Sequence, residues 1–337
     1  MISMADTVKM PADIARECEE SVEYVQLVAD VLLLHDDVEP TAVEPVTSAS
    51  DSYVKCRDTI VARTKGLAIL VRDLTVQLRG AKLSDVSRTL RSTAEAVIAL
   101  TEAATHAAYT IGVADPRSKP YQPGLVDRYR FSRARFGITS ACRKFHKDYG
   151  SLTEQQIVQV SSQIAANLTV LTESSRMAAD IAPDPMSQDQ FRQCAKSISG
   201  TTAALLSAIK CYAKSRQEKD REKCIIFTKP LLETINAMMA FGSLPEYSGV
   251  AARMSEQGRE AQCAILGGAM AVVSSSIRLF TSTASLIENH EDPVQWQKMM
   301  QCCKAISDST KLLSGALREN SITGSQRAPF FAVNSQE

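Results

Sequence analysis

The sequence predicts an all-α protein of nine helices, arranged as a four-helix bundle inserted into a five-helix bundle. Three observations favour this fold class. Apolar residues recur at three- and four-residue steps, only 14 of the 337 residues are glycine and 12 proline, and proline-bearing breaks divide the pattern. The clearest repeat runs from Leu83 to Ile111 at 3-4-3-4 spacing. That spacing places its residues along one stripe of a helix.

Three helices are expected before the first break, over 12–34, 51–79 and 84–114. A loop with Pro40 and Pro45 separates the first two helices. After the third helix, residues 115–124 hold three prolines. Proline lacks a backbone donor and restricts the residue before it, so these residues are predicted to form a linker.

Four helices should follow the linker, over 125–147, 153–181, 188–214 and 218–241, up to a second break at 242–245. A long helix over 248–289, on the order of 60 Å, and a last helix from Pro293 to Glu319 complete the pattern. Two final helices cannot bury their stripes alone, so they should join the first three. We therefore predict a five-helix bundle from 12–120 and 246–320, an inserted four-helix bundle at 124–243, and a disordered tail at 321–337.

Charge divides the chain in the same way. The whole chain is neutral, but residues 124–243 hold 17 Lys/Arg and 11 Asp/Glu, a net +6 that leaves −6 elsewhere. A basic module within an acidic chain indicates an acidic partner. Nucleic acid is disfavoured because the pI is near 6.9 and no recognition motif is present.

Targeting and redox signals point to the cytoplasm. The N-terminus lacks the basic and apolar regions of a signal peptide. No uncharged apolar run reaches about 18 residues, so no membrane insertion is expected. The nearest run, 264–280, is interrupted by Gly267, Gly268 and Ser274–Ser276. The nine cysteines include no pair at two-residue spacing, which favours reduced cysteines packed as small apolar residues.

No catalytic, cofactor or metal site is predicted. His35, His106, His146 and His290 lie far apart, and none is paired with a carboxylate on one helix face. A phosphate-binding role for Gly267 and Gly268 would require a preceding strand, so close helix–helix approach is the expected reason for both glycines. The sequence thus argues against an enzyme.

Two surfaces are candidates for partner binding. Arg133, Lys144 and Lys147 should point outward together from the first helix of the basic module, with an ordinary solvated face as the alternative. A second basic set comprises Lys196, Lys210 and Lys214. On the last helix of the module, Ile226 lies about 140° from the core direction. Ile226 and Phe227 are therefore candidates for the centre of a self-association patch, with an exposed hydrophobic surface that binds nothing as the alternative.

Several long segments resemble the talin rod-like helical bundle family. They are Cys56–Leu67 (CRDTIVARTKGL), Gln122–Arg130 (QPGLVDRYR) and Ala264–Met270 (AILGGAM). The resemblance runs from about Gln26 to Glu319 but does not cover the first 25 residues, the region around Trp296 or the tail. It implies a four-helix bundle inserted in a five-helix bundle. It also implies homodimerisation through the four-helix module, binding and bundling of F-actin, and a place in filopodia or other actin-rich protrusions.

Two other binding functions stay open. The chain could be an adaptor whose bundle grooves dock amphipathic helices of adhesion or signalling proteins. A lipid-surface binder is disfavoured, because the apolar stripes are narrow, rich in small residues and poor in bulky aromatics.

Overall fold

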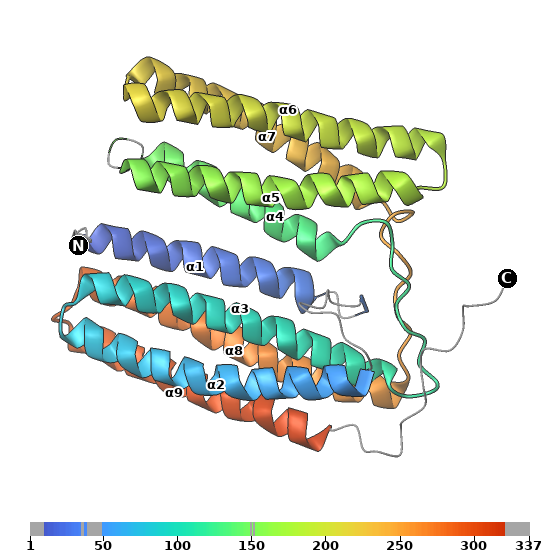
Figure 1. Cartoon of the computed structure of the whole chain (residues 1–337). Helices are drawn as coiled ribbons and strands as arrows, with labels where there is room; N and C mark the ends of the chain where they lie inside the picture. The colour runs from blue at the N-terminus through green and yellow to red at the C-terminus, as the bar shows by residue number, and fades with distance from the viewer. Residues whose placement is uncertain (1–9, 35–36, 39–48, 149, 151, 321–337) are drawn as a thin grey trace. The chain divides into compact units, whose positions relative to one another are not determined.

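The computed structural model describes residues 10–34, 37–38, 49–148, 150 and 152–320, but not the side chains of 49–52 and 147–148. These residues form nine α-helices and no β-strand (Figure 1), so the predicted all-α class is confirmed. The predicted tail at 321–337, Pro40 and Pro45 lie outside the described residues. The helices are α1 (Pro11–Leu32), α2 (Ala49–Arg79), α3 (Leu83–Val113), α4 (Arg128–Asp148), α5 (Glu154–Ile181), α6 (Pro185–Ser215), α7 (Glu218–Gly242), α8 (Glu256–Glu288) and α9 (Pro293–Glu319).

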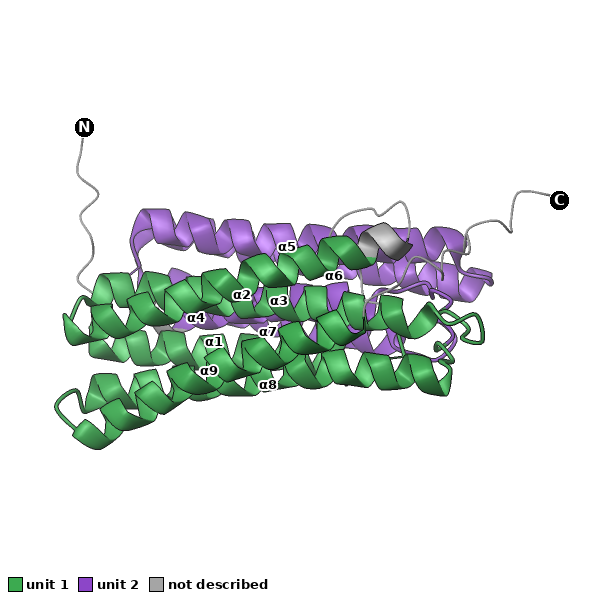
Figure 2. Ribbon diagram, turned by 90° about the horizontal axis from the view of Figure 1, so that it is seen from below, with its two compact units in different colours: residues 1–121, 251–337 green, residues 122–250 purple. Residues whose placement is uncertain are grey.

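The chain divides into two compact units, shown in different colours in Figure 2. Residues 1–121 and 251–337 form the five-helix unit, which contains α1, α2, α3, α8 and α9. Residues 122–250 form the four-helix unit, α4 to α7, and interrupt the sequence of the first. Residues 246–250, which we expected in the five-helix bundle, belong to the four-helix unit because Tyr247 is buried in its core.

The five-helix unit is built in layers around α3 and α8, which pack against each other. α1 packs on both of them, α2 packs on α3, and α9 packs on α8 beside α2. The stripe predicted from the 3-4 spacing forms much of this core. Its members Leu90, Val97, Leu100 and Ala104 are fully buried.

One glycine explains the close packing of α8 on α9. A Cβ atom at Gly268 would lie only 2.7 Å from Leu313 Cα, so the helices can approach this closely only where the side chain is absent. Gly267 would meet nothing within 4 Å. The expectation of close helix–helix approach is therefore correct for Gly268 and wrong for Gly267.

The start of α8 differs from the prediction. The helix begins at Glu256 rather than at 248, because the preceding residues are extended and pair with the linker. Lys119 pairs with Arg253 in the five-helix unit, and Gln122 pairs with Val250 in the four-helix unit. α8 therefore has 33 residues and a length of about 50 Å, shorter than expected.

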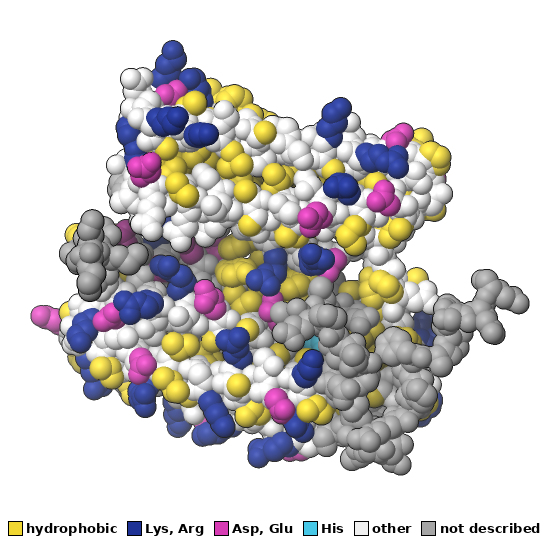
Figure 3. Space-filling model, viewed as in Figure 1, with side chains coloured by type: hydrophobic (Ala, Val, Ile, Leu, Met, Phe, Trp, Pro, Cys, Tyr) yellow, Lys and Arg dark blue, Asp and Glu magenta, His cyan; other side chains and the backbone are white. Residues whose placement is uncertain are grey.

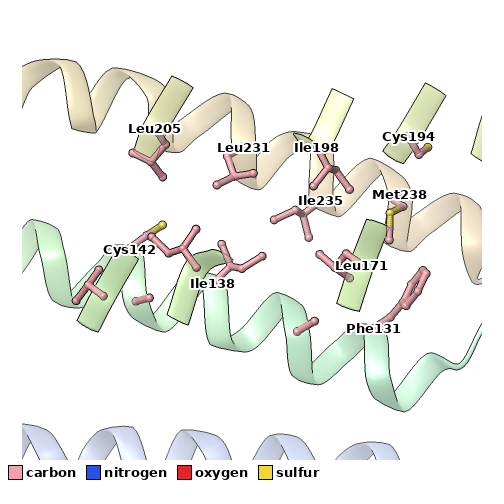
Figure 4. Close-up of a cluster of buried hydrophobic side chains, with 14 of the residues drawn as sticks. Phe131, Ile138, Cys142, Leu171, Cys194, Ile198, Leu205, Leu231, Ile235 and Met238 are labelled. Carbon is pink, nitrogen blue, oxygen red and sulfur yellow. The ribbon is translucent and has the colours of Figure 1, made fainter. Parts of the chain in front are cut away.

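In the four-helix unit each helix packs on the next along the chain, and α7 returns to α4 as the least closely packed neighbour. The buried apolar side chains of these helices form one cluster (Figure 4), and Leu168 of α5 packs against it partly buried. All four helices contribute to it, with Phe131, Ile138, Leu171, Ile198, Leu205, Leu231, Ile235 and Met238 among its members.

Two helices of this unit begin three residues away from the predicted start. α4 begins at Arg128 rather than 125, because Asp127 acts as its N-cap and accepts from Arg130 N at 2.9 Å, while the N–H groups of Leu125 and Val126 donate to Tyr247 O. α6 begins at Pro185 rather than 188, where Asp184 acts as N-cap and accepts from Ser187 N at 2.9 Å. α7 continues through Pro230 to Gly242.

Candidate functional site

The outer face of α6 presents basic side chains along most of its length. Lys196 and Lys214 are 18 residues apart, which is five helical turns, so they point in the same direction about 27 Å apart. Lys210 lies about 40° from them, and all three side chains are exposed. Asp189 is the only acidic residue within α6. The face is therefore positive with little internal compensation, and Figure 3 shows Lys and Arg gathered over one end of α6 and α7.

The basic residues predicted on α4 are less available than those on α6. Arg133 and Lys144 point within about 20° of each other, but both are half-buried. The Arg133 guanidinium also stacks over the Tyr129 ring, with 5.6 Å between Cζ and the ring centroid. The side chain of Lys147 lies outside the described part of the chain. Exposure thus favours the set on α6, which we had placed second.

The apolar surface on α7 is centred one residue earlier than predicted. Ile226 is 64% exposed and Ile225 is 42% exposed. Phe227 is instead half-buried and packs against the core of the unit. Ile225 was missed because only Ile226 lies opposite the core direction. It stands about 100° from Cys224, on the flank of the helix.

Within the part of the chain that the structure describes, two helices, α7 and α8, are long and apolar enough to cross a membrane by length and composition alone. In α8, 56% of the apolar window is buried within the protein, as expected for a core helix. In α7 the buried share is only 28%. α7 therefore carries more apolar surface than its own unit covers, which agrees with the exposure of Ile225 and Ile226.

Five cysteines are packed in the cores as expected, namely Cys18, Cys142, Cys194, Cys224 and Cys302, whereas Cys211 and Cys263 are exposed. All nine are free, and burial raises the pKa of the Cys18 and Cys224 thiols to about 12. Burial likewise raises the pKa of Cys142 to about 11. Thiols with such high pKa values are poor nucleophiles and poor metal ligands at neutral pH.

His146 bridges α4 and α7. Its Nε2 lies 2.8 Å from Thr228 Oγ1, and burial together with the nearby Arg221 lowers its pKa, so the ring is neutral at neutral pH. Among the described residues, no three His, Cys, Asp or Glu side chains are placed to hold a metal ion. His35 lies outside those residues.

Comparison with known proteins shows which proteins this chain resembles. The family described as the Talin IBS2B domain matches residues 126–245, which is nearly the whole four-helix unit. Talin-1 of Gallus gallus is 30% identical over 90% of this chain, and talin of Oscarella pearsei is 32% identical over 91%. The chain is a talin rod-like helical bundle protein. It spans only 12% of the length of each of these relatives, and the same holds for Talin-2 of Mus musculus, which is 30% identical.

Proposed function

We propose that this chain is a non-enzymatic protein that binds F-actin through the exposed basic face of α6. It homodimerises through α7, so that one dimer links two filaments in the actin-rich protrusions of the cytoplasm, such as filopodia. The observation that carries the proposal is the alignment of the exposed side chains of Lys196, Lys210 and Lys214 on a unit of net positive charge.

Electrostatics supports this assignment. An acidic filament is attracted to a basic face, and the attraction raises the association rate. Small side chains at Gly200, Ala203 and Ser207 separate the lysines on α6, so nothing bulky holds a flat partner away from the charges. The resemblance to talin rod bundles adds a family in which F-actin binding is expected.

The surplus apolar surface of α7 supports the dimer. Ile225 and Ile226 are exposed side by side. Burying both against a second copy would stabilise the dimer by about 25 cal/mol for each Å² of apolar area removed from water. Filament cross-linking needs two filament sites per particle, and a dimer supplies them with one site per chain.

Co-sedimentation with F-actin tests the filament site. Reversing Lys196, Lys210 and Lys214 to Glu should strongly reduce the fraction that pellets, because the face changes by six charges. Exposed charges are screened over about 8 Å at physiological salt, so binding by the unmodified chain should also weaken as salt rises.

A matched variant, Arg133→Glu with Lys144→Glu, reports on α4 in the same assay. Helicity by circular dichroism and dimer mass by light scattering should be unchanged in both variants. Unchanged pelleting of the α6 variant at low and high salt would overturn the choice of α6. A loss confined to the α4 variant would return the site to the face first predicted.

A further inference from the structure

The solvent face of α2 carries more apolar surface than a helix of a free-standing unit needs. Val61, Ile69 and Val76 are 39%, 50% and 65% exposed, and Val54 is exposed as well. At 100° per residue these four side chains lie within an arc of about 80°, turned away from the buried stripe of Ile60, Leu67 and Leu74. From Val54 to Val76 the arc extends for about 33 Å.

α9 lies beside α2 and extends this surface. Thr75 Oγ1 is 3.7 Å from Cys303 Sγ, and the Tyr53 hydroxyl donates to Leu317 O at 2.9 Å, so the two helices meet along much of their length. On α9, Met300, Lys304 and Lys311 turn from this contact line toward solvent on the side of the α2 arc, and all are exposed. We call the combined surface the α2–α9 face; it consists of Val54, Asp58, Val61, Lys65, Ile69, Arg72, Val76, Met300, Lys304 and Lys311. Asp58, its one acidic member, is ion-paired with the neighbouring Arg57.

Charge within the five-helix unit is unevenly divided between its helices. α2 and α9 together hold ten Lys/Arg and five Asp/Glu, a net +5. α1, which packs on α3 and α8 from the other side, holds one Arg and six Asp/Glu, a net −5. Such a unit orients in the field of a negatively charged surface with α2 and α9 toward it. The ion pairs Arg72–Asp73 and Lys311–Asp308 are exposed and weakly held, so these cations stay available.

The combination of apolar and basic side chains distinguishes this face from that of α6. Burial of valine and isoleucine side chains is favourable only against an apolar partner. On α6, by contrast, the lysines are separated by Gly, Ala and Ser, which offer little apolar surface. Apolar side chains flanked by Lys and Arg on one helix surface are typical of contact with anionic bilayers, where the apolar groups enter the headgroup boundary and the cations meet lipid phosphates.

We propose that the α2–α9 face docks the five-helix unit onto an anionic phospholipid surface. Contact is peripheral, with α2 lying in the plane of the membrane. α2 is not among the two helices apolar enough to cross a bilayer. The sequence argument against lipid binding concerned the narrow buried stripes; the side chains that carry this proposal are those left outside the core. The proposal does not rest on the filament site of the four-helix unit.

Vesicle co-sedimentation of the full chain tests the proposal. The chain should pellet with vesicles of phosphatidylcholine mixed with phosphatidylserine and stay in solution with phosphatidylcholine alone. Reversing Lys65, Lys304 and Lys311 to Glu should lower vesicle affinity by at least about 100-fold, given the contribution of each lysine near an anionic surface. Replacing Val61, Ile69 and Val76 by Ser should lower it independently of salt, because it removes only apolar contact.

Matched controls use the four-helix unit. The Lys196, Lys210 and Lys214 reversal carries the same charge change, and Val158→Ser with Ile181→Ser removes exposed apolar groups of similar size. Neither control should change vesicle binding. The proposal is overturned if the intact chain does not bind the anionic vesicles, or if the controls reduce binding as much as the face variants do. It is also overturned if the face variants lose F-actin pelleting but keep vesicle binding, since the face would then be a filament site.

Discussion

Ile226 and Phe227 are adjacent in sequence but have different surroundings, and this difference decides how the dimer should be tested. Ile226 is 64% exposed, so Ile226→Glu leaves the core intact and places a carboxylate only in the proposed interface. A buried unpaired carboxylate is costly, so this variant should be a folded monomer. Light scattering gives the mass, and circular dichroism gives the helicity.

The control at this scale is Val158→Glu on α5, which is 58% exposed and should remain dimeric. Phe227→Asp is a poorer probe, because Phe227 packs against the core and its loss should also lower the unfolding temperature of the four-helix unit. An Ile226→Glu chain that keeps the dimer mass would place the interface elsewhere.

At the scale of one helix, Ser255 determines where α8 begins. Its Oγ accepts from Gly258 N at 3.0 Å and donates to Asp115 Oδ2 at 2.7 Å. Ser255→Ala removes both bonds and should lower the free energy of unfolding by about 1–2 kcal/mol, as measured by denaturant titration at neutral pH. Ser162→Ala, at an exposed site within α5, should change it by much less.

The stability that this cap contributes should decrease in acid. Hydrogen bonds from Arg117 and Ser255 hold the pKa of Asp115 well below its ordinary 3.8. A carboxyl group whose pKa is lowered by folding stabilises the folded state at pH values above its ordinary pKa. This contribution is lost as the pH falls through the folded-state pKa. The difference between Ser255→Ala and the unmodified chain should therefore shrink in strong acid. A difference that stays constant would show that Asp115 is not part of the cap.

The helices could be predicted from spacing because burial repeats every three or four residues, as it does from Leu83 to Ile111. The start of α8 could not, because Val250 and Arg253 are extended by pairing with residues more than a hundred positions earlier. The outward direction of Lys196, Lys210 and Lys214 was predictable from helical rotation alone. The half-burial of Phe227 was not, because rotation gives a direction on one helix and not the reach of its neighbours.

For the whole molecule, bundling should require both the α6 face and the dimer. The unmodified chain should bring filaments down in a low-speed spin, which collects only bundles. Ile226→Glu should abolish low-speed pelleting yet still bind single filaments at high speed, with affinity reduced by the loss of avidity. The α6 triple reversal should fail in both spins. If monomeric Ile226→Glu still bundles, each chain must hold two filament sites, and the α2–α9 face, with net +5 on its two helices, would be the first place to look for the second.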